Sequence, residues 1–585
     1  MPLGRHRVTV GTQNELYRIR NLFAQNSYGV WEFSSLDSLQ SGTAGRYQAG
    51  VGLGGPIDAR FDAAQLGLYV QDRWQPSERF VLTAGLRLDV PFLLDKPQEN
   101  PAVLADYGRR TDEVPSGNLQ FSPRIGFNWN MSGDRVEQLR GGVGLFVARP
   151  PFVWLGNGFQ NSGTGLAQLT CVSSGTVPRF TSSSAASPPA ECVDGATAAT
   201  TGDIALLSND LRFPQFARAS LAYDHRFGHA WIASVEAMYT RAVSNFFYTN
   251  LALAGPQGFD RNGRVVYGSI ATTGEATPVL SGPRRNVIDV QNAGKDYSYS
   301  LTAALNRRFT NWFEAHASYT YSQARDIQSL TSSVATSNWR FGRAISGDQY
   351  SQHLDRSRFE LPHRVVAYGT FSLLSTRTDI SLIYLGQSGS NYDFVYGGSG
   401  GAGDLNADGA QGNDLIYIPA DVAKDSEIRF SGVSPVAGAD NSPAAQEQRI
   451  AEQRSAFERY ITSTDCLTRQ RGRMMTRNSC RSPWTNTVNV SLRQALPAVF
   501  GQTVTAQLDV FNFLNLLNAN WGQQPLPPNG GGSVPLLTHV GQTSGALTGP
   551  EGSQGIFTFD PATEKYDRRH VGSAFQMQFG VRYAF

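Results

Sequence analysis

The 585-residue chain contains 60 glycines, 33 phenylalanines, 22 tyrosines and 9 tryptophans, and its 50 basic and 48 acidic residues leave a formal net charge of +2. This balance excludes the concentrated basic excess of a nucleic-acid binder, so no nucleic-acid partner is expected. The mean hydropathy of −0.30 and the lack of any apolar run near the roughly 18 to 20 residues of a membrane helix exclude helical membrane spans, but not strands of alternating polarity.

The N-terminal segment, residues 1–10, reads MPLGRHRVTV and lacks the apolar core of a secretory signal peptide. Taken alone, this feature favours the cytoplasm. The segments that follow are typical of an exported protein, however, and a barrel-type strand already begins near Val8. We therefore expect the chain to be part of a longer protein whose N-terminal region is missing.

The rest of the chain repeats one pattern, in which about ten residues of alternating polarity precede a break rich in Gly, Pro, Asn or Asp. In residues 80–89, FVLTAGLRLD, Leu82 and Leu86 share one face while Thr83 and Arg87 share the other. A period of two is the period of a β-strand. The same pattern predicts further strands at 66–72, 123–130, 141–148, 217–227, 231–240, 299–309, 313–321, 365–373, 379–386, 487–493 and 504–513.

Two kinds of connection separate these strands. Short turns join some of them, as between Phe227 and Trp231, whereas residues 156–211, 323–361 and 386–483 form stretches far longer than the loops of soluble domains. Short turns on one side and long loops on the other are typical of bacterial outer-membrane barrels. We therefore predict an all-β fold, an antiparallel up-and-down transmembrane β-barrel, with these three stretches as extracellular loops.

The four cysteines fall as two local pairs, Cys171 with Cys192 and Cys466 with Cys480, each inside a long predicted loop. Their even number and local spacing predict two disulfides, which form in an oxidising compartment. Four unpaired loop thiols are the alternative.

An oxygen-rich motif lies in the longest loop, with Asp404, Asn406 and Asp408 at alternate positions and a glycine in the sixth place. This spacing matches the start of a calcium-binding loop. The twelfth position is Leu415 where such loops have a bidentate Glu, and Asp414 is a candidate substitute. A structural Ca²⁺ and an Asx-rich surface turn are equally compatible with the motif.

Other short motifs match phosphate-binding or catalytic patterns but lack the structural context that these functions need. Residues 50–55 satisfy G-x-G-x-x-G without a following helix, and residues 397–401 satisfy G-x-S-x-G inside a glycine-rich loop. The eight histidines form no H-E-x-x-H motif and no Cys–His cluster. We therefore predict that the chain is not an enzyme.

The last eleven residues, FQMQFGVRYAF, alternate strictly between large apolar and polar or small residues. One face carries Met577 together with Phe575, Phe579, Val581, Tyr583 and Phe585. A soluble sandwich would seldom leave six large apolar groups on one face at its terminus. We expect 575–585 to be the closing strand of the barrel, since a terminal aromatic strand resembles the signal read by the outer-membrane assembly machinery.

These segments resemble the TonB-dependent receptors with an Oar-like barrel. The resemblance is carried by YVQDRWQP at 69–76, AGLRLD at 84–89, SPRIGF at 122–127, DLNADGAQGNDLIYIP at 404–419, DVFNFLN at 509–515 and FGVRYAF at 579–585. It implies a barrel of about 22 strands, plugged by an N-terminal domain whose TonB box contacts the energy-coupling protein. No plug or TonB box is recognisable here, so we expect an incomplete barrel, the C-terminal portion of such a receptor.

The resemblance implies a receptor and active transporter for a bulky ligand, of the iron chelate, cobalamin, oligosaccharide or peptide class. The implied partners are outer-membrane lipid, the assembly machinery, the unidentified ligand, and TonB through a plug outside this chain. A passive porin or a surface adhesion barrel is the alternative. A secreted all-β enzyme, the third hypothesis, lacks a catalytic constellation.

Overall fold

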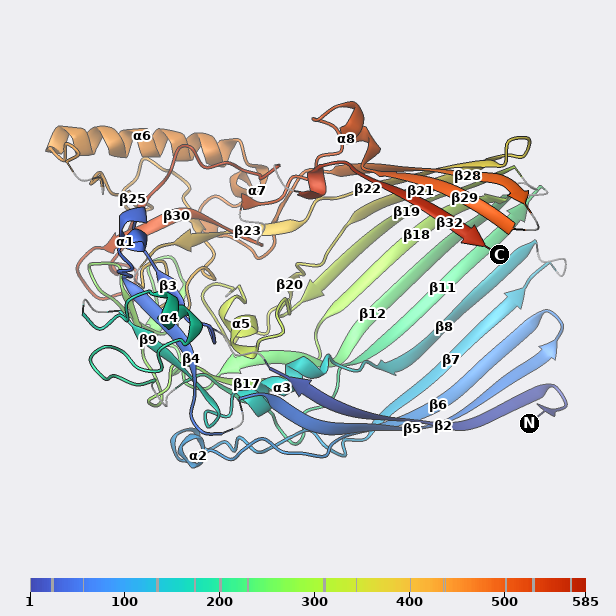
Figure 1. Cartoon of the computed structure of the whole chain (residues 1–585), viewed down its shortest axis with the longest axis horizontal. Helices are drawn as coiled ribbons and strands as arrows, with labels where there is room; N and C mark the ends of the chain where they lie inside the picture. The colour runs from blue at the N-terminus through green and yellow to red at the C-terminus, as the bar shows by residue number, and fades with distance from the viewer. Residues whose placement is uncertain are drawn as a thin grey trace.

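The computed structural model describes residues 2–584 apart from 23–25, 56, 133–135, 173–174, 199–201, 229–230, 309–311, 344, 400, 435, 437, 500–501, 529–531 and 569–570. Its main feature is an 18-stranded sheet whose long strands lie side by side along a curved surface (Figure 1). The long strands are β2 (His6–Asn21), β5 (Ala59–Ser77), β6 (Phe80–Leu93), β7 (Gln120–Asn130), β8 (Glu137–Val147), β11 (Gln215–Phe227), β12 (Trp231–Asn250), β18 (Tyr297–Arg308), β19 (Phe313–Asp326), β21 (His363–Leu373), β22 (Thr378–Gln387), β28 (Thr485–Val499), β29 (Gln502–Phe511) and β32 (Gln576–Ala584).

Each long strand pairs antiparallel with the next long strand along the chain. This connectivity confirms the predicted antiparallel, up-and-down, all-β fold. The lengths are sufficient for the roughly 9 to 11 residues with which a tilted strand crosses a bilayer. Several strands are longer than predicted, and β12 continues from the predicted end at 240 to Asn250. Its last five residues are buried and do not alternate in exposure, so a period of two could not reveal them.

One face of the sheet is apolar and exposed. On β5, for example, the side chains of Leu66, Leu68 and Val70 are 41 %, 58 % and 45 % exposed. A water-soluble protein would bury such a continuous apolar surface, whereas lipid is its natural environment. The outer face of the sheet is therefore the lipid-facing surface.

The other face carries cross-strand polar contacts. The Arg140 guanidinium of β8 contacts the carboxylate of Asp224 on β11 at 3.0 Å and that of Glu236 on β12 at 3.1 Å. On the next pair of strands, the hydroxyls of Thr302 and Thr320 lie 2.9 Å apart. This polar face is the lumen side of the barrel, as alternation along each strand requires.

The two edge strands are not joined in the described part of the chain. There β32 pairs with β29, and no pairing links β32 to β2, which lies at the opposite edge of the curved sheet (Figure 1). The assignment of 575–585 as the closing strand thus stays a prediction. Phe585, the last residue of the predicted assembly signal, lies outside the described residues.

The long interstrand segments gather at the end of the sheet opposite the two termini (Figure 1). Those that follow β22 and β29 fold together into a cap, which we define as five strands and two helices. These are β23 (Asn391–Gly397), β25 (Arg429–Phe430), β27 (Cys480–Arg481), β30 (Ser533–Gln542), β31 (Gly555–Thr558), α6 (Pro443–Thr462) and α7 (Asp465–Thr468). The strand order is β25-β31-β30-β23-β27, and β23 runs parallel to β30.

The cap has its own hydrophobic core. Phe394 of β23 and Leu537 of β30 are each 1 % exposed, and Phe457 and Ile461 of α6 are fully buried against the same cluster. Helix α6 begins where Ser442 accepts a hydrogen bond from the backbone N–H of Ala445 and proline occupies the first turn. The segment 386–483, predicted as one extracellular loop, therefore contains packed secondary structure.

Shorter elements complete the structure. The strands β3 (Val30–Glu32), β4 (Arg46–Gly52) and β9 (Leu166–Cys171) form a second small sheet. The remaining elements are β1 (Pro2–Leu3), β10 (Ile204–Leu206), β13 (Gly258–Phe259), β14 (Val265–Val266), β15 (Gly268–Ile270), β16 (Ala276–Pro278), β17 (Val287–Ala293), β20 (Asp355–Arg356), β24 (Tyr417–Ile418), β26 (Arg473–Met474), α1 (Leu36–Gln40), α2 (Pro101–Tyr107), α3 (Phe152–Gln160), α4 (Ser182–Ala186), α5 (Ala335–Arg340), α8 (Phe513–Leu517) and η2 (Val571–Ser573). No helix in the described ranges is long and apolar enough to cross a membrane.

Two disulfides tie these surface segments. Cys171, at the end of β9, is bonded to Cys192, with a Cα–Cα distance of 5.8 Å. Cys466 of α7 is bonded to Cys480 of β27, with a Cα–Cα distance of 5.3 Å. The second disulfide joins the end of the helical segment to the edge of the cap sheet.

The orientation of β32 gives a first testable prediction. Val581 is 64 % exposed on the apolar face, next to Arg582 on the polar face. Val581→Arg should add roughly 2 to 4 kcal/mol to the free energy of membrane insertion if the residue lies near the midplane, whereas Arg582→Ala should be tolerated. We expect the first variant, and not the second, to lower the amount of heat-modifiable, assembled protein in outer-membrane fractions. Equal assembly of both variants would contradict the lipid-facing assignment.

The cap disulfide gives a second prediction. Replacing Cys466 and Cys480 by serine removes a cross-link across a sequence separation of 14 residues, which the chain-entropy model values at about 3 kcal/mol of stability. Limited proteolysis of the membrane-embedded protein should therefore cleave the α6 region faster in this variant. Serine at Cys171 and Cys192, whose bond starts from β9 in a separate small sheet, is the matched control and should leave that cleavage rate unchanged. Identical rates in all three proteins would show that the cap does not depend on its cross-link.

Candidate functional site

A polar pocket of about 570 Å³ lies in the cap beside the Cys466–Cys480 disulfide. Its walls come from α7, β27, β20 and the segment that precedes β32. The charged side chains that line it are five cations and one carboxylate, namely Arg356, Arg469, Arg473, Arg481, Lys565 and Asp465. We call this cavity the basic pocket.

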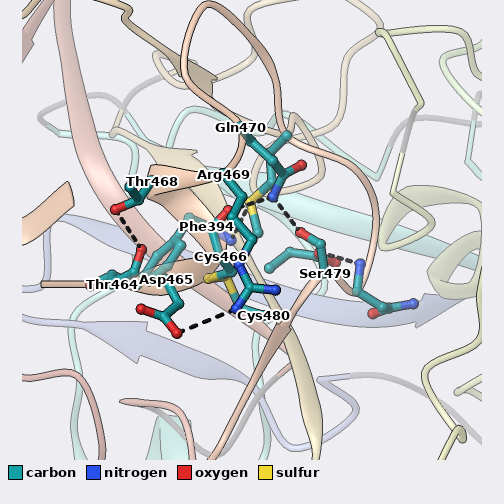
Figure 2. Close-up of a disulfide and its surroundings, with 12 residues drawn as sticks. Phe394, Thr464, Asp465, Cys466, Thr468, Arg469, Gln470, Ser479 and Cys480 are labelled. Atoms are coloured by element: carbon teal, nitrogen blue, oxygen red, sulfur yellow. Dashed lines mark hydrogen bonds and ion pairs between the residues drawn. A yellow bond between two sulfur atoms is a disulfide. The ribbon is translucent and has the colours of Figure 1, made fainter. Parts of the chain in front are cut away.

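Covalent and hydrogen bonds hold the two main walls of the basic pocket together. Figure 2 shows the Cys466–Cys480 disulfide with Asp465, Arg469 and Gln470 around it. The Gln470 side-chain amide donates to the backbone oxygen of Cys466 at 2.7 Å and to the hydroxyl of Ser479 at 3.0 Å. The strand that carries Arg481 is thereby fixed against the turn that carries Arg469.

A single buried carboxylate contacts three arginines behind the pocket. Glu360, which is 4 % exposed, lies 2.8 Å from the guanidinium of Arg325, 3.0 Å from that of Arg356 and 3.1 Å from that of Arg481. One negative charge cannot neutralise three positive charges, so this side of the pocket carries a net positive charge.

Two cations of the pocket have lowered pKa values. Burial lowers the pKa of Arg481 to about 10, an effect that Glu360 opposes and the neighbouring Arg356 reinforces. Burial also lowers the pKa of Lys565, against the opposing effect of Asp465. Both shifts therefore reflect mainly the partial removal of these cations from water.

The predicted calcium residues do come together, at a separate site. Asp404, Asn406, Asp408 and Asp414 are all at most 2 % exposed. Asp404 accepts hydrogen bonds from the backbone N–H groups of Asp408 and Gly409, so its carboxylate closes the turn of the motif.

The other carboxylates of this motif also have partners inside the protein. Asp414 contacts the buried guanidinium of Arg264 at 2.7 Å, and Asp408 accepts hydrogen bonds from the amides of Asn406 and Asn413 at 2.9 Å and 3.1 Å. Within the described ranges, no group of three or more His, Cys, Asp or Glu side chains has the arrangement of a metal site. Burial and the neighbouring Asp414 raise the pKa of Asp408 to about 6. The assignment of a structural Ca²⁺ stays a prediction.

The described residues of the predicted assembly signal share the apolar face of β32 and its approach. Phe575, Phe579, Val581 and Tyr583 are 41 %, 71 %, 64 % and 52 % exposed. Their side chains contribute to the lipid-facing surface, and none of them lines the basic pocket.

The basic pocket is the feature that the sequence did not reveal. Its cations come from three places in the chain, near residues 356, 469–481 and 565, and only the fold brings them together. The one sequence signal was the arginine-rich stretch TRQRGRMMTR at 468–477, enclosed by Cys466 and Cys480. Four arginines in a short cross-linked loop are a signal of an anion-binding surface.

Comparison with known proteins identifies the family. Residues 1–530 match the family model described as "Outer membrane beta barrel domain". No curated protein matches the chain.

Three solved structures are among those similar to the chain. The outer-membrane transporter YddB from Escherichia coli has a TM-score of 0.40 at 10 % identity over 87 % of this chain and 51 % of its own. The FrpB iron transporter from Neisseria meningitidis has a TM-score of 0.40 at 11 % identity over 88 % and 50 %. A mutant of the ferric enterobactin receptor PfeA from Pseudomonas aeruginosa has a TM-score of 0.41 at 10 % identity over 99 % and 51 %.

The chain thus spans about half the length of each of these three proteins. The family match covers most of the chain, and the antiparallel sheet with its apolar outer face is the fold that this family requires. The chain belongs to the outer membrane beta barrel domain family, and its place is the bacterial outer membrane.

Proposed function

We propose that the chain is part of a receptor that captures a bulky ligand at the cell surface and transports it across the outer membrane with energy supplied through TonB. The observation that carries this proposal is the cap, in which two long interstrand segments share one sheet, one core and a polar pocket. A selective receptor needs such a preorganised surface, because binding energy is lost when flexible loops must be ordered on binding.

The position of the cap supports the same proposal. It lies at the end of the sheet opposite the short turns and the chain termini (Figure 1), and in barrels of this kind the longer loops face the outside of the cell. A ligand arriving from outside therefore meets the cap before the lumen.

The resemblance to receptors with an Oar-like barrel adds the energy source. The segments at 69–76 and 509–515 that carry this resemblance fall on β5 and β29 and their edges. Such receptors move their ligands actively, and we extend that property to this protein. The ligand classes that remain open are iron chelates, cobalamin, oligosaccharides and peptides.

TonB dependence distinguishes this proposal from a passive porin or an adhesion barrel. We expect the native protein, in intact cells of its own host, to form a chemical cross-link to TonB that disappears when TonB is deleted. A matched test reconstitutes the native protein into planar bilayers, where a gated receptor should show no steady conductance. Steady ion conductance without a TonB cross-link would identify a passive porin. The absence of both the conductance and the cross-link would identify an adhesion barrel. Either outcome would overturn the proposal.

A further inference from the structure

The charge of the basic pocket is not balanced by its own carboxylates. Among the residues that line it, Asp465 is the one acid, and its contact with Arg469 is a 3.3 Å pair between side chains that are 89 % and 77 % exposed. Such an exposed pair contributes little to stability. Asp465 thus leaves most of the positive charge uncompensated.

Two further cations of the pocket, Arg473 and Lys565, are bound to neutral oxygens. Arg473 donates to the backbone oxygen of Arg469 at 3.1 Å, and Lys565 donates to the backbone oxygen of Ser463 at 2.6 Å. In the part of the chain that the structure describes, neither side chain has a carboxylate within ion-pair distance. These contacts orient the cations without neutralising them.

A polar group in the wall also lacks a partner. Thr464 is 7 % exposed, and its hydroxyl oxygen has no hydrogen-bond partner among the described residues. A buried hydroxyl without a partner costs about 1 to 3 kcal/mol. The Thr464 hydroxyl is enclosed in the wall, so recognition of a ligand by the pocket depends on its cations.

We propose that the basic pocket binds an anion that carries two or more carboxylate or phosphate groups; this inference rests on the proposed receptor function and names its ligand class. Arginine forks bind such groups through paired charge-assisted hydrogen bonds, and three sides of the pocket supply a cation for them. The volume of about 570 Å³ lies within the range of about 300 to 1,000 Å³ that is usual for small-molecule sites.

The cross-link and the buried Glu360 hold the pocket open in the absence of a ligand. The disulfide fixes the turn that carries Arg469 and Arg473 against the strand that carries Arg481. Glu360 holds the guanidinium groups of Arg356 and Arg481 in place from behind. The anion then enters a site in which Arg356 and Arg481 are already positioned, which avoids the entropy cost of ordering these two side chains on binding.

Calorimetry on the full chain, purified in detergent, tests the proposal with citrate and pyrophosphate as probes and a neutral trisaccharide as the control. We expect at least one anion to bind, with an affinity that falls as sodium chloride is raised, because the interaction is between charges. The trisaccharide should not bind. Failure of both anions to bind, or equal binding of the trisaccharide, would overturn the proposal.

A set of charge-removing variants assigns the binding to this pocket. The double variant Arg469→Gln/Arg473→Gln should lose at least about tenfold in affinity, since a hydrogen bond to a charged group contributes on the order of 2 kcal/mol. Arg471→Gln is the matched control, because Arg471 lies in the same turn but pairs with Glu458 and does not line the pocket. Equal losses in both proteins would overturn the assignment.

Two controls keep the result interpretable. Heat-modifiable migration shows whether each variant is folded, and Lys565→Gln, from a different wall, should weaken binding in the same direction. Unchanged binding in Lys565→Gln together with unchanged binding in the double variant would place the anion elsewhere. Anion binding in detergent does not require TonB, so the two proposals can fail separately. A protein that forms the TonB cross-link but binds neither anion contradicts the ligand class alone. A protein that binds an anion but forms no cross-link contradicts energised transport alone.

Discussion

Backbone hydrogen bonding in lipid is the constraint on which the rest of this structure depends. The bilayer core offers no water, so each N–H and C=O group of a spanning strand must be bonded within the protein. From β5 to β29 each long strand accordingly has a ladder partner on both sides. Once the backbone is satisfied in this way, side chains are sorted only by face, apolar toward lipid and polar toward the lumen. Irregular backbone is confined to the ends of the sheet, as short turns at one end and as long segments with α6 and the cap strands at the other.

The same sorting explains how much of the fold could be predicted from the sequence. Residues such as Leu82 and Leu86 alternate with Thr83 and Arg87 because lipid and lumen impose opposite preferences, and a period of two is readable without a structure. The prediction fails where this difference between the faces disappears. At the end of β12, Phe246 and Phe247 are both buried beneath the interstrand segments, so the strand continues without an alternating signal.

The functional residues were less accessible to sequence analysis because they depend on contacts between distant segments. Arg356, Arg473 and Lys565 share a pocket only because the cap joins segments from three parts of the chain. The acidic motif shows the converse limit. Its spacing is local and was recognised, but the partner of Asp414 is Arg264, a residue from another interstrand segment that the motif cannot specify. Local spacing therefore located the motif but left its ligand, Ca²⁺ or the protein's own groups, undetermined.

The parallel pairing of β23 with β30 has a consequence for biogenesis. Residue 393 lies beside residue 533, and between them in the chain are α6, the disulfide turn and the hairpin of β28 and β29. The sheet of the cap therefore cannot be completed before the segment that carries β28, β29 and β30 has been exported. Contacts of such long sequence separation form slowly. Completion of the surface end of this protein thus depends on segments that lie on both sides of the β28–β29 hairpin.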